Sequence, residues 1–340
     1  MTFDAVIIGG SYAGLSAALQ LARARRNVLV IDGGSRRNRF AKASHGFLAQ
    51  DGRAPGAIAA TARTQLMAYP TVTWIDAYAA ASRLIGSDFS VETDNGESHA
   101  AKRLILATGV ADHLPDIPGL AERWGHSVFH CPYCHGYELG AGPVGVLASS
   151  ALSMHHALML PDWGPTTLFV NEAFAPDATQ LDQLRRREVT LEYEPITKIS
   201  GKADIELKDG RVIALNGLFT LTRTDMASPL AEQLGCTFEQ GPLGPFIQTN
   251  MVKETTVPGV FACGDAARAA GSVALAVGDG ALAGASAHQS LIFATCEASG
   301  YRHADKLFSP VSFITCVQFK SKFGRHARES GHPVFQSGRK

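Results

Sequence analysis

The sequence predicts an α/β protein whose parallel sheets are covered by helices and divided between two domains. Three observations predict this class. A strand–turn–helix–strand unit opens the chain, a second strand–turn–helix pattern follows residue 142, and 340 residues suffice for two hydrophobic cores. Because 31 Lys and Arg residues balance 31 Asp and Glu residues, net charge favours neither nucleic acid nor an acidic surface as a partner.

The opening unit reads as a dinucleotide-binding βαβ unit. Buried strands are predicted at residues 4–8 and 27–31, with an alanine- and leucine-rich helix at 15–24 between them. A glycine-rich turn precedes the helix, although Ser11 replaces the second glycine of the usual pattern, and Asp32 follows the second strand. Turn amides suit a pyrophosphate and the acid suits a ribose hydroxyl. A chance helix start is the alternative. The residues predicted to bind the cofactor here are Gly9, Gly10, Ser11, Ala13, Gly14 and Asp32.

Three further segments are predicted to lie near the same cofactor. One buried strand ends in the small residues Ala107, Thr108 and Gly109, where a backbone approaches a ligand closely. A strand at 260–263 delivers Gly264 and Asp265 to the head of a helix, where Asp265 is otherwise only a cap. The polar loop after Asp32 includes Asn38, and the loop at 44–48 places His45 against a cofactor ring or in the core.

Two cysteines, Cys131 and Cys134, are separated by two residues and form a reversible disulfide store for two electrons. Pro132 stiffens the ring, and a helix is expected to start after Cys134 and favour a thiolate. His135 supplies an acid/base group. The alternative is half of a zinc site, which needs a second cysteine pair. The remaining cysteines occur singly, so redox chemistry without a metal is predicted: Cys236, Cys263, Cys296 and Cys316.

The second strand–turn–helix pattern repeats the shape of the first without its binding chemistry. Its turn, residues 148–153, contains no glycine, and the segment after the next strand, residues 171–174, contains no arginine to accept a 2′-phosphate. Both Rossmann-like units are expected to form three-layer α/β domains.

Together these motifs resemble the low-molecular-weight thioredoxin reductase family over about residues 3 to 293. The resemblance implies a discontinuous FAD domain at 1–113 and 247–296, and an inserted NAD(P)-type domain with the CxxC pair at 114–246. It also implies that the glycine turn faces the FAD pyrophosphate, Asp32 the adenosine ribose, and Gly264 with Asp265 the ribityl chain. Cys134 is then the thiol that faces the flavin, and Cys131 exchanges with substrate.

Two departures narrow the resemblance. The glycine-free turn argues against NADP, which stays open as a second cofactor, and His135 stands where thioredoxin reductases carry an aspartate. The run from Cys131 to Glu138 resembles the branch that contains the gliotoxin and holomycin dithiol oxidases. That branch implies an FAD homodimer that oxidises a small-molecule dithiol and passes the electrons to oxygen.

The alternatives are a disulfide reductase driven by NAD(P)H or ferredoxin, with a thioredoxin-like protein as partner, a flavin redox sensor without turnover, and a protein that has lost its function. Few cysteines and no charged leader predict the cytoplasm. Residues 273–294 contain Asp279 and His288, so no membrane span is expected. The two domains are expected to keep one fixed arrangement, and residues 297–340 to form a basic, poorly ordered tail.

Overall fold

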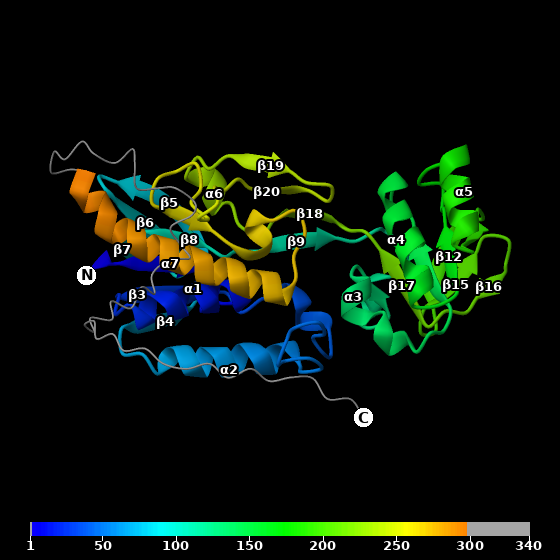
Figure 1. Cartoon of the computed structure of the whole chain (residues 1–340), viewed down its shortest axis with the longest axis horizontal. Helices are drawn as coiled ribbons and strands as arrows, with labels where there is room; N and C mark the ends of the chain where they lie inside the picture. The colour runs from blue at the N-terminus through cyan, green and yellow to red at the C-terminus, as the bar shows by residue number, and fades with distance from the viewer. Residues whose placement is uncertain (1, 298–340) are drawn as a thin grey trace, which may run out of the picture. The chain divides into compact units, whose positions relative to one another are not determined.

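The computed structural model describes the backbone of residues 2–297 and the side chains of residues 2–293, so the predicted tail lies outside the described residues (Figure 1). The strands are β1 Thr2–Phe3, β2 Ala5–Ile8, β3 Val28–Asp32, β4 Val72–Asp76, β5 Ala79–Ile85, β6 Asp88–Thr93, β7 Ser98–Ala101, β8 Leu104–Leu106, β9 Val110–His113, β10 Val128–Phe129, β11 Val144–Leu147, β12 Thr166–Phe169, β13 Thr190–Glu192, β14 Ile196–Ser200, β15 Asp204–Leu207, β16 Val212–Ile213, β17 Gly217–Thr220, β18 Arg223–Met226, β19 Phe238–Gln240, β20 Pro245–Ile247 and β21 Val260–Ala262. The helices are α1 Tyr12–Arg23, α2 Pro55–Met67, α3 Pro132–His135, α4 Met154–Met159, α5 Ala178–Arg186, α6 Leu230–Gln233 and α7 Val273–Glu297.

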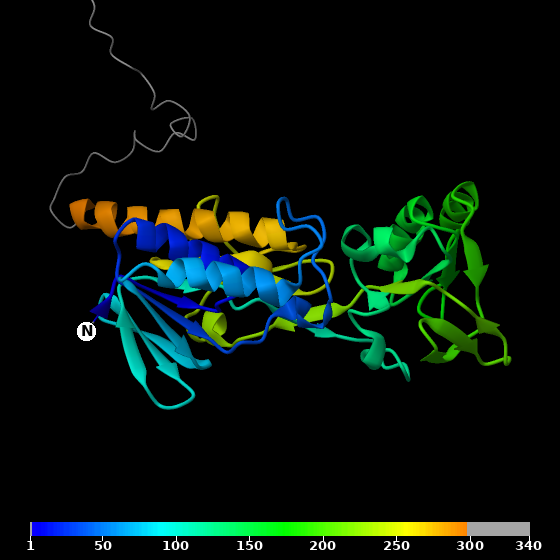
Figure 2. The ribbon, with the colours of Figure 1, turned by 90° about the horizontal axis from the view of Figure 1, so that it is seen from below.

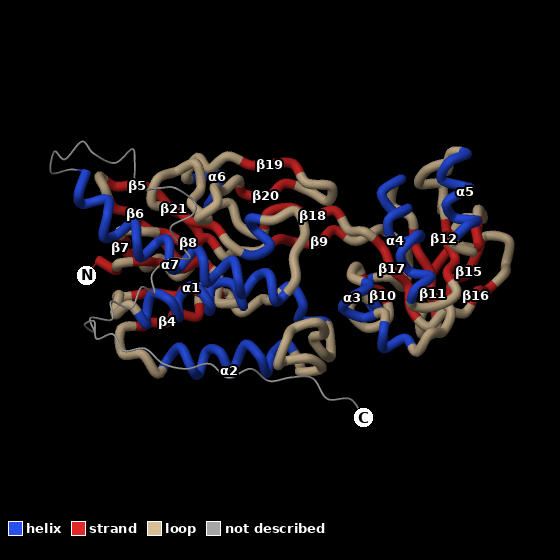
Figure 3. The backbone as a smooth tube through the Cα atoms, in the orientation of Figure 1, coloured by secondary structure: helices blue, strands red, loops and turns tan. Residues whose placement is uncertain are grey.

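Two parallel five-stranded sheets organise the described chain, which confirms the predicted α/β class. The first sheet has the order β21-β8-β2-β3-β4, and the second has the order β10-β17-β11-β12-β13. All pairs within both sheets are parallel, so the strands need helical crossovers that cover their faces. Smaller antiparallel sheets, β1-β7-β6-β5 (with β1 parallel to β7) and β14-β15-β16, accompany them (Figure 3).

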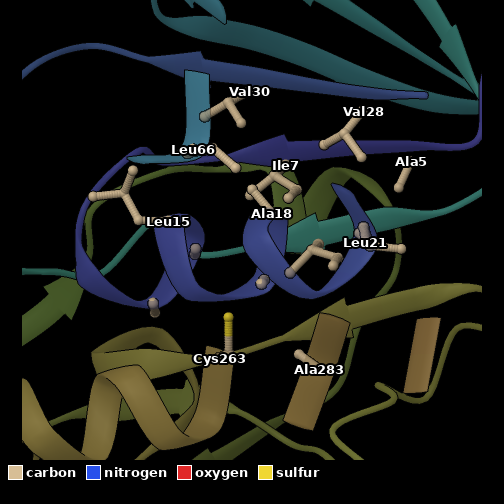
Figure 4. Packing of buried hydrophobic residues seen from close by; sticks show 14 of the residues in the cluster. Ala5, Ile7, Leu15, Ala18, Leu21, Val28, Val30, Leu66, Cys263 and Ala283 are labelled. Atoms are coloured by element: carbon tan, nitrogen blue, oxygen red, sulfur yellow. The ribbon is translucent and has the colours of Figure 1, made fainter. Parts of the chain in front are cut away.

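Close helix packing explains the small residues of α1 and α7. The apolar side of α1 packs on Ile7, Val28 and Val30 of the first sheet, and its other side approaches Ala283 (Figure 4). A Cβ atom on Gly284 would lie 2.4 Å from the carbonyl oxygen of Ala17, so only glycine permits this approach. The small residues of α7 therefore permit close packing on α1, and α1, α2 and α7 run alongside one another in both ribbon views (Figure 2).

The chain leaves the first sheet through β9 and returns through β18, and these two strands pair with each other antiparallel. After the return, Leu230, Ala231 and Ile247 pack in one core cluster with Leu104 and Val260 of the first sheet. Residues from β18 to β20 therefore share the first sheet's core. The predicted domain limits remain predictions.

Three local expectations were wrong. The helix near the cysteine pair is α3, which contains Cys134 and ends at His135 instead of starting after Cys134. The apolar pattern of residues 191–196 predicts a single strand, but the structure divides this segment between β13 and β14, because Pro195 lies between them. Asp265 lies in a short 3₁₀ turn, Gly264–Ala267, and the long helix begins only at Val273.

The sequence reading also missed β5, β7, β9, α5 and α6, where the alternation of apolar residues is weak. Across the described residues, none of the helices combines the length and apolar character that a membrane crossing requires.

Candidate functional site

A cavity of about 950 Å³ lies where four strands of the first sheet end. Its wall includes the residues that directly follow β2, β3, β8 and β21. Carboxyl ends of parallel strands are where α/β sheets bind ligands. Most residues predicted from the sequence line it: Gly9, Ser11, Ala13, Asp32, Asn38, His45, Ala107, Thr108, Gly109, Cys134, His135, Gly264 and Asp265. Gly10, Gly14 and Cys131 are not among the described residues that form its wall.

The glycine turn between β2 and α1 is shaped by close backbone approach. Gly9 has φ of +102°, and a Cβ atom there would lie 2.3 Å from the carbonyl oxygen of Ala107. A Cβ atom on Gly14 would lie 1.8 Å from the carbonyl oxygen of Gly9. Gly10 and Gly14 therefore shape the turn from behind the wall. The hydroxyl of Ser11 makes no capping hydrogen bond to α1. The backbone amides of the first turn of α1 therefore have no acceptor from this side chain and stay available to a ligand.

Asp32 is held at the end of β3 by the same turn. Its Oδ1 accepts a hydrogen bond from the backbone N–H of Gly10 at 3.0 Å. Asn38 is oriented by Tyr12, because its amide nitrogen donates to the Tyr12 hydroxyl at 3.1 Å and that hydroxyl donates to the Pro55 carbonyl. The glycine cradle, the acid and the room available fit the pyrophosphate and ribose of a dinucleotide.

Asp265 is hydrogen-bonded by Arg37, which lies in the polar loop after Asp32. Nη1 of Arg37 donates to Oδ2 of Asp265 at 2.8 Å, and the same guanidinium donates twice to the carboxylate of Asp112. Burial would raise the pKa of Asp112, but the hydrogen bonds and charge of Arg37 hold it below its usual range. Both Arg37 and Asp112 line the cavity.

Cys131 and Cys134 form a disulfide. Cys131 is the residue before α3, and Cys134 lies within it, half-buried, in the cavity wall. Tyr133 and Tyr137 flank the pair and are 74% and 86% exposed. One sulfur therefore borders the cavity, while the segment that carries the pair also reaches the surface. A further sulfur in the wall, Cys263, is fully buried, and burial raises its pKa to about 12, so it is a poor nucleophile.

Three histidines surround this segment. His135 stacks on Phe129 with ring centroids 4.3 Å apart, and burial, with His130 and His45 nearby, lowers its pKa to about 4. Burial and the charge of Arg37 lower the pKa of His130 to about 4 as well. His156 is buried, and burial, with His155 and His130 nearby, lowers its pKa to about 4. All three rings are neutral near pH 7, which is the form that accepts a proton.

In the second sheet, serine side chains accept hydrogen bonds from backbone amides of the turn after β11, residues 148–153. Oγ of Ser153 accepts the backbone N–H of Ser149 at 3.0 Å, and Oγ of Ser150 accepts that of Leu152 at 3.2 Å. Ser153 is fully buried. Amides that would otherwise be available to a phosphate at this turn are therefore bonded within it.

Comparison with known proteins supports this geometry. Residues 3–280 match the family of pyridine nucleotide-disulphide oxidoreductases. The chain belongs to this family. The thioredoxin reductase tcpT of Claviceps purpurea is 34% identical over 304 residues, which cover 85% of this chain and 94% of that protein. The pyridine nucleotide-disulphide oxidoreductase family binds FAD, its use of NADP is compatible with this chain, and the resemblance predicted from the motifs is confirmed.

Solved structures give the same result. An oxidoreductase from Agrobacterium tumefaciens is 58% identical, with a TM-score of 0.84 over 86% of this chain and 99% of that chain. The crystal structure of HlmI is 33% identical, with a TM-score of 0.82 over 88% of this chain and 95% of that chain. The protein is thus a flavin-dependent oxidoreductase that acts on sulfur groups, with thiols or disulfides as substrates.

Sequence reasoning missed several cavity residues. His130 directly precedes Cys131, and this position next to the cysteine pair could have identified it as a site residue. Asp112 and Trp124 carried none, because they belong to none of the sequence motifs and reach the cavity only through the tertiary fold.

Proposed function

We propose that this oxidoreductase is a dithiol oxidase that takes electrons from a dithiol and passes them through FAD to oxygen. The observation that carries the proposal is the contrast between two sites. The disulfide borders the cavity that the glycine turn after β2 also lines. In the turn after β11, by contrast, backbone amides already donate hydrogen bonds to serine side chains of the same turn. Electrons then enter at the cysteine pair and need no nicotinamide.

Cys131 is the proposed point of entry. A substrate thiolate attacks Sγ of Cys131, the Cys131–Cys134 bond breaks, and Cys134 leaves as a thiolate. The second substrate thiol then attacks the mixed disulfide, so that the product leaves as a disulfide and Cys131 as a thiolate. Two electrons and two protons have left the dithiol. Bound FAD would supply the two-electron chemistry that joins the reduced pair to the proposed acceptor, oxygen, which with the two protons would become hydrogen peroxide.

The cofactor is proposed to lie on the residues already identified in the wall. The turn from Gly9 to Gly14 would face the pyrophosphate, and Asp32 the ribose, because its second oxygen is not used by Gly10. The rest of the FAD molecule would be lined by Asn38, His45, the run from Ala107 to Gly109, and Gly264 with Asp265.

His135 is the proposed proton acceptor. It lines the cavity together with Cys134, and its ring is fixed by stacking on Phe129. A neutral imidazole held there takes the proton of an incoming thiol, and the thiolate is the form that attacks.

The test mixes the purified yellow protein anaerobically with dithiothreitol in one cuvette and with NADPH in another. Bleaching of the flavin band by dithiothreitol alone is expected. The variant Cys131→Ser should not be bleached by the dithiol although it retains FAD. Rapid bleaching by NADPH would contradict the proposal and identify a disulfide reductase.

A reductase driven by ferredoxin is the second candidate, because it needs no nucleotide turn. Reduced ferredoxin, added without a dithiol, would then reduce both the flavin and the Cys131–Cys134 pair. Failure of reduced ferredoxin, together with peroxide formation from dithiol and oxygen, would favour the oxidase.

A homodimer in the cytoplasm is part of the proposal. Support for the dimer comes from α7, which exposes Leu275, Leu282 and Phe293. Low cysteine content supports a reducing compartment. Light scattering on the holoenzyme should give twice the chain mass, and a monomer at micromolar concentration would contradict the dimer.

A further inference from the structure

Two strands connect the first sheet with the sheet that carries the cysteine pair. The chain passes outward along β9 and returns along β18, and Asp112 pairs with Thr224 in that antiparallel ladder. Cys134 lies in α3, in the segment of chain between β9 and β18, and it reaches the cavity from that segment. Whatever holds β9 and β18 to the first sheet therefore also holds Cys134 at the cavity.

The guanidinium of Arg37 bonds β9 directly, and it reaches the returning chain through Asp112. Arg37 begins the 3₁₀ turn Arg37–Phe40, which follows β3. Its Nε donates to Oδ2 of Asp112 at 2.8 Å, and its Nη2 donates to Oδ1 at 2.7 Å, which makes the pair bidentate. The hydroxyl of Thr222, the second residue after β17 on the returning chain, donates to the same Oδ1 at 2.7 Å.

The third arm of the guanidinium reaches the first sheet. Nη1 of Arg37 donates to Oδ2 of Asp265 at 2.8 Å, in the 3₁₀ turn that follows β21. The exposed fraction of the Asp112 side chain is 10%, and that of Arg37 is 23%. Removing one partner of such a buried pair leaves the other charge without compensation, so the contact resists separation more strongly than a surface pair.

We propose that Arg37 is a positioning residue that clamps β9 and the returning chain to the first sheet and so keeps Cys134 at the FAD cavity. The proposal rests on the proposed role of Cys134 toward FAD, but it does not depend on the identity of the thiol substrate or of the electron acceptor. Arg37 acts through Asp112 and Thr222 and takes no part in proton or electron transfer.

The chain offers a matched control in Arg211. That arginine also makes three hydrogen bonds to two carboxylates, those of Glu192 and Asp209, but it lies beside the second sheet and is 54% exposed. The variants are Arg37→Met, the conservative Arg37→Lys, and Arg211→Met. A fourth variant, Thr222→Val, removes one hydroxyl donor outside the cavity wall.

The first readout is the charge-transfer absorbance between the Cys134 thiolate and oxidised FAD after anaerobic reduction of the holoenzyme by two electrons. Arg37→Met should lose most of this band and slow flavin reduction by dithiothreitol about 10- to 100-fold, since misplacing reacting groups by about 1 Å costs that much. Arg37→Lys should recover part of the band, and Arg211→Met should match the wild type.

The second readout is hydrogen exchange of the amides in β9 and β18. Arg37→Met and, more weakly, Thr222→Val should speed exchange in both strands, whereas Arg211→Met should not. This readout also decides the proposal if Arg37→Met fails to retain FAD. Wild-type exchange in both variants, or a wild-type band in Arg37→Met, would overturn the clamp. A wild type that forms no band and is not bleached by dithiols would instead contradict the proposed function, and the exchange data would still decide the clamp.

Discussion

The turn after β2 and the turn after β11 have the same place in the fold but opposite chemistry. Each follows a buried parallel strand and leads into a helix that covers its sheet. The turn after β2 has glycines at positions where a Cβ atom would clash with the backbone, and no side chain caps the helix α1 that follows it. The second has three serines, two of which cap its own amides.

This contrast shows that a βαβ unit is a scaffold and that its turn decides what it binds. Close approach of a pyrophosphate needs an absent Cβ and free amides. Hydroxyl groups at the same place satisfy the amides internally and stabilise the turn without a ligand. Substitutions in the turn after β2 should therefore lower the content of bound cofactor. Substitutions in the turn after β11 should affect only the stability of the protein.

The largest effect is expected for Gly14→Ala. Its Cβ atom would lie 1.8 Å from the carbonyl oxygen of Gly9, so α1 must shift away from the turn. We expect loss of bound FAD and a free energy of unfolding lower by about 3 kcal/mol. Flavin absorbance per protein and denaturant titration measure the two effects.

Gly56→Ala is the control, because a Cβ atom added to this exposed helical glycine of α2 would meet only the guanidinium end of Arg36, at 3.6 Å, among the described atoms within 4 Å. It should retain FAD and gain up to about 1 kcal/mol of stability from helix propensity. Equal loss of FAD in both variants would contradict the role assigned to the first turn.

Lowering the pH should destabilise the protein by protonating three histidines near the cysteine pair. The folded pKa values of His130, His135 and His156 are lowered from 6.5 to about 4. Between these pH values the unfolded chain binds more protons, so stability is complete above about pH 6.5 and falls as the pH is lowered toward 4. Each histidine contributes a slope of up to about 1.4 kcal/mol per pH unit.

The variant His156→Gln should flatten this dependence, because Gln keeps a polar side chain at this buried position but does not titrate. Thermal unfolding between pH 7 and pH 5 is the measurement. His155→Gln, at the exposed neighbouring position, serves as the control and should follow the wild type.

The smallest effect is expected for Ser153→Ala. It leaves the N–H of Ser149 without its acceptor, which should lower the free energy of unfolding by about 1 kcal/mol. Flavin content and dithiol bleaching should not change. Gain of rapid bleaching by NADPH in this variant would show that the serine alone closes the second turn to nucleotides.

Local patterns were enough to predict much of the fold. Apolar runs of four to five residues predicted β2 and β3, and glycines fixed the place of the first turn, because both signals depend on neighbours in sequence. The cysteine pair was identified by its spacing alone, and its disulfide by the same spacing. Antiparallel strands such as β5 and β7 escaped because their partners, not their own residues, stabilise them.

The family, the cofactor class and the position of the disulfide follow from the sequence alone, since short-range spacing encodes turns, strand ends and the CxxC ring. Which groups meet at the cavity follows only from the tertiary fold. Arg37, Asp112, Thr222 and Asp265 are brought together across as many as 228 positions of sequence separation. A charged side chain in a polar loop reads as solvated until the fold supplies its partners, because burial and ion pairing are properties of three-dimensional neighbours.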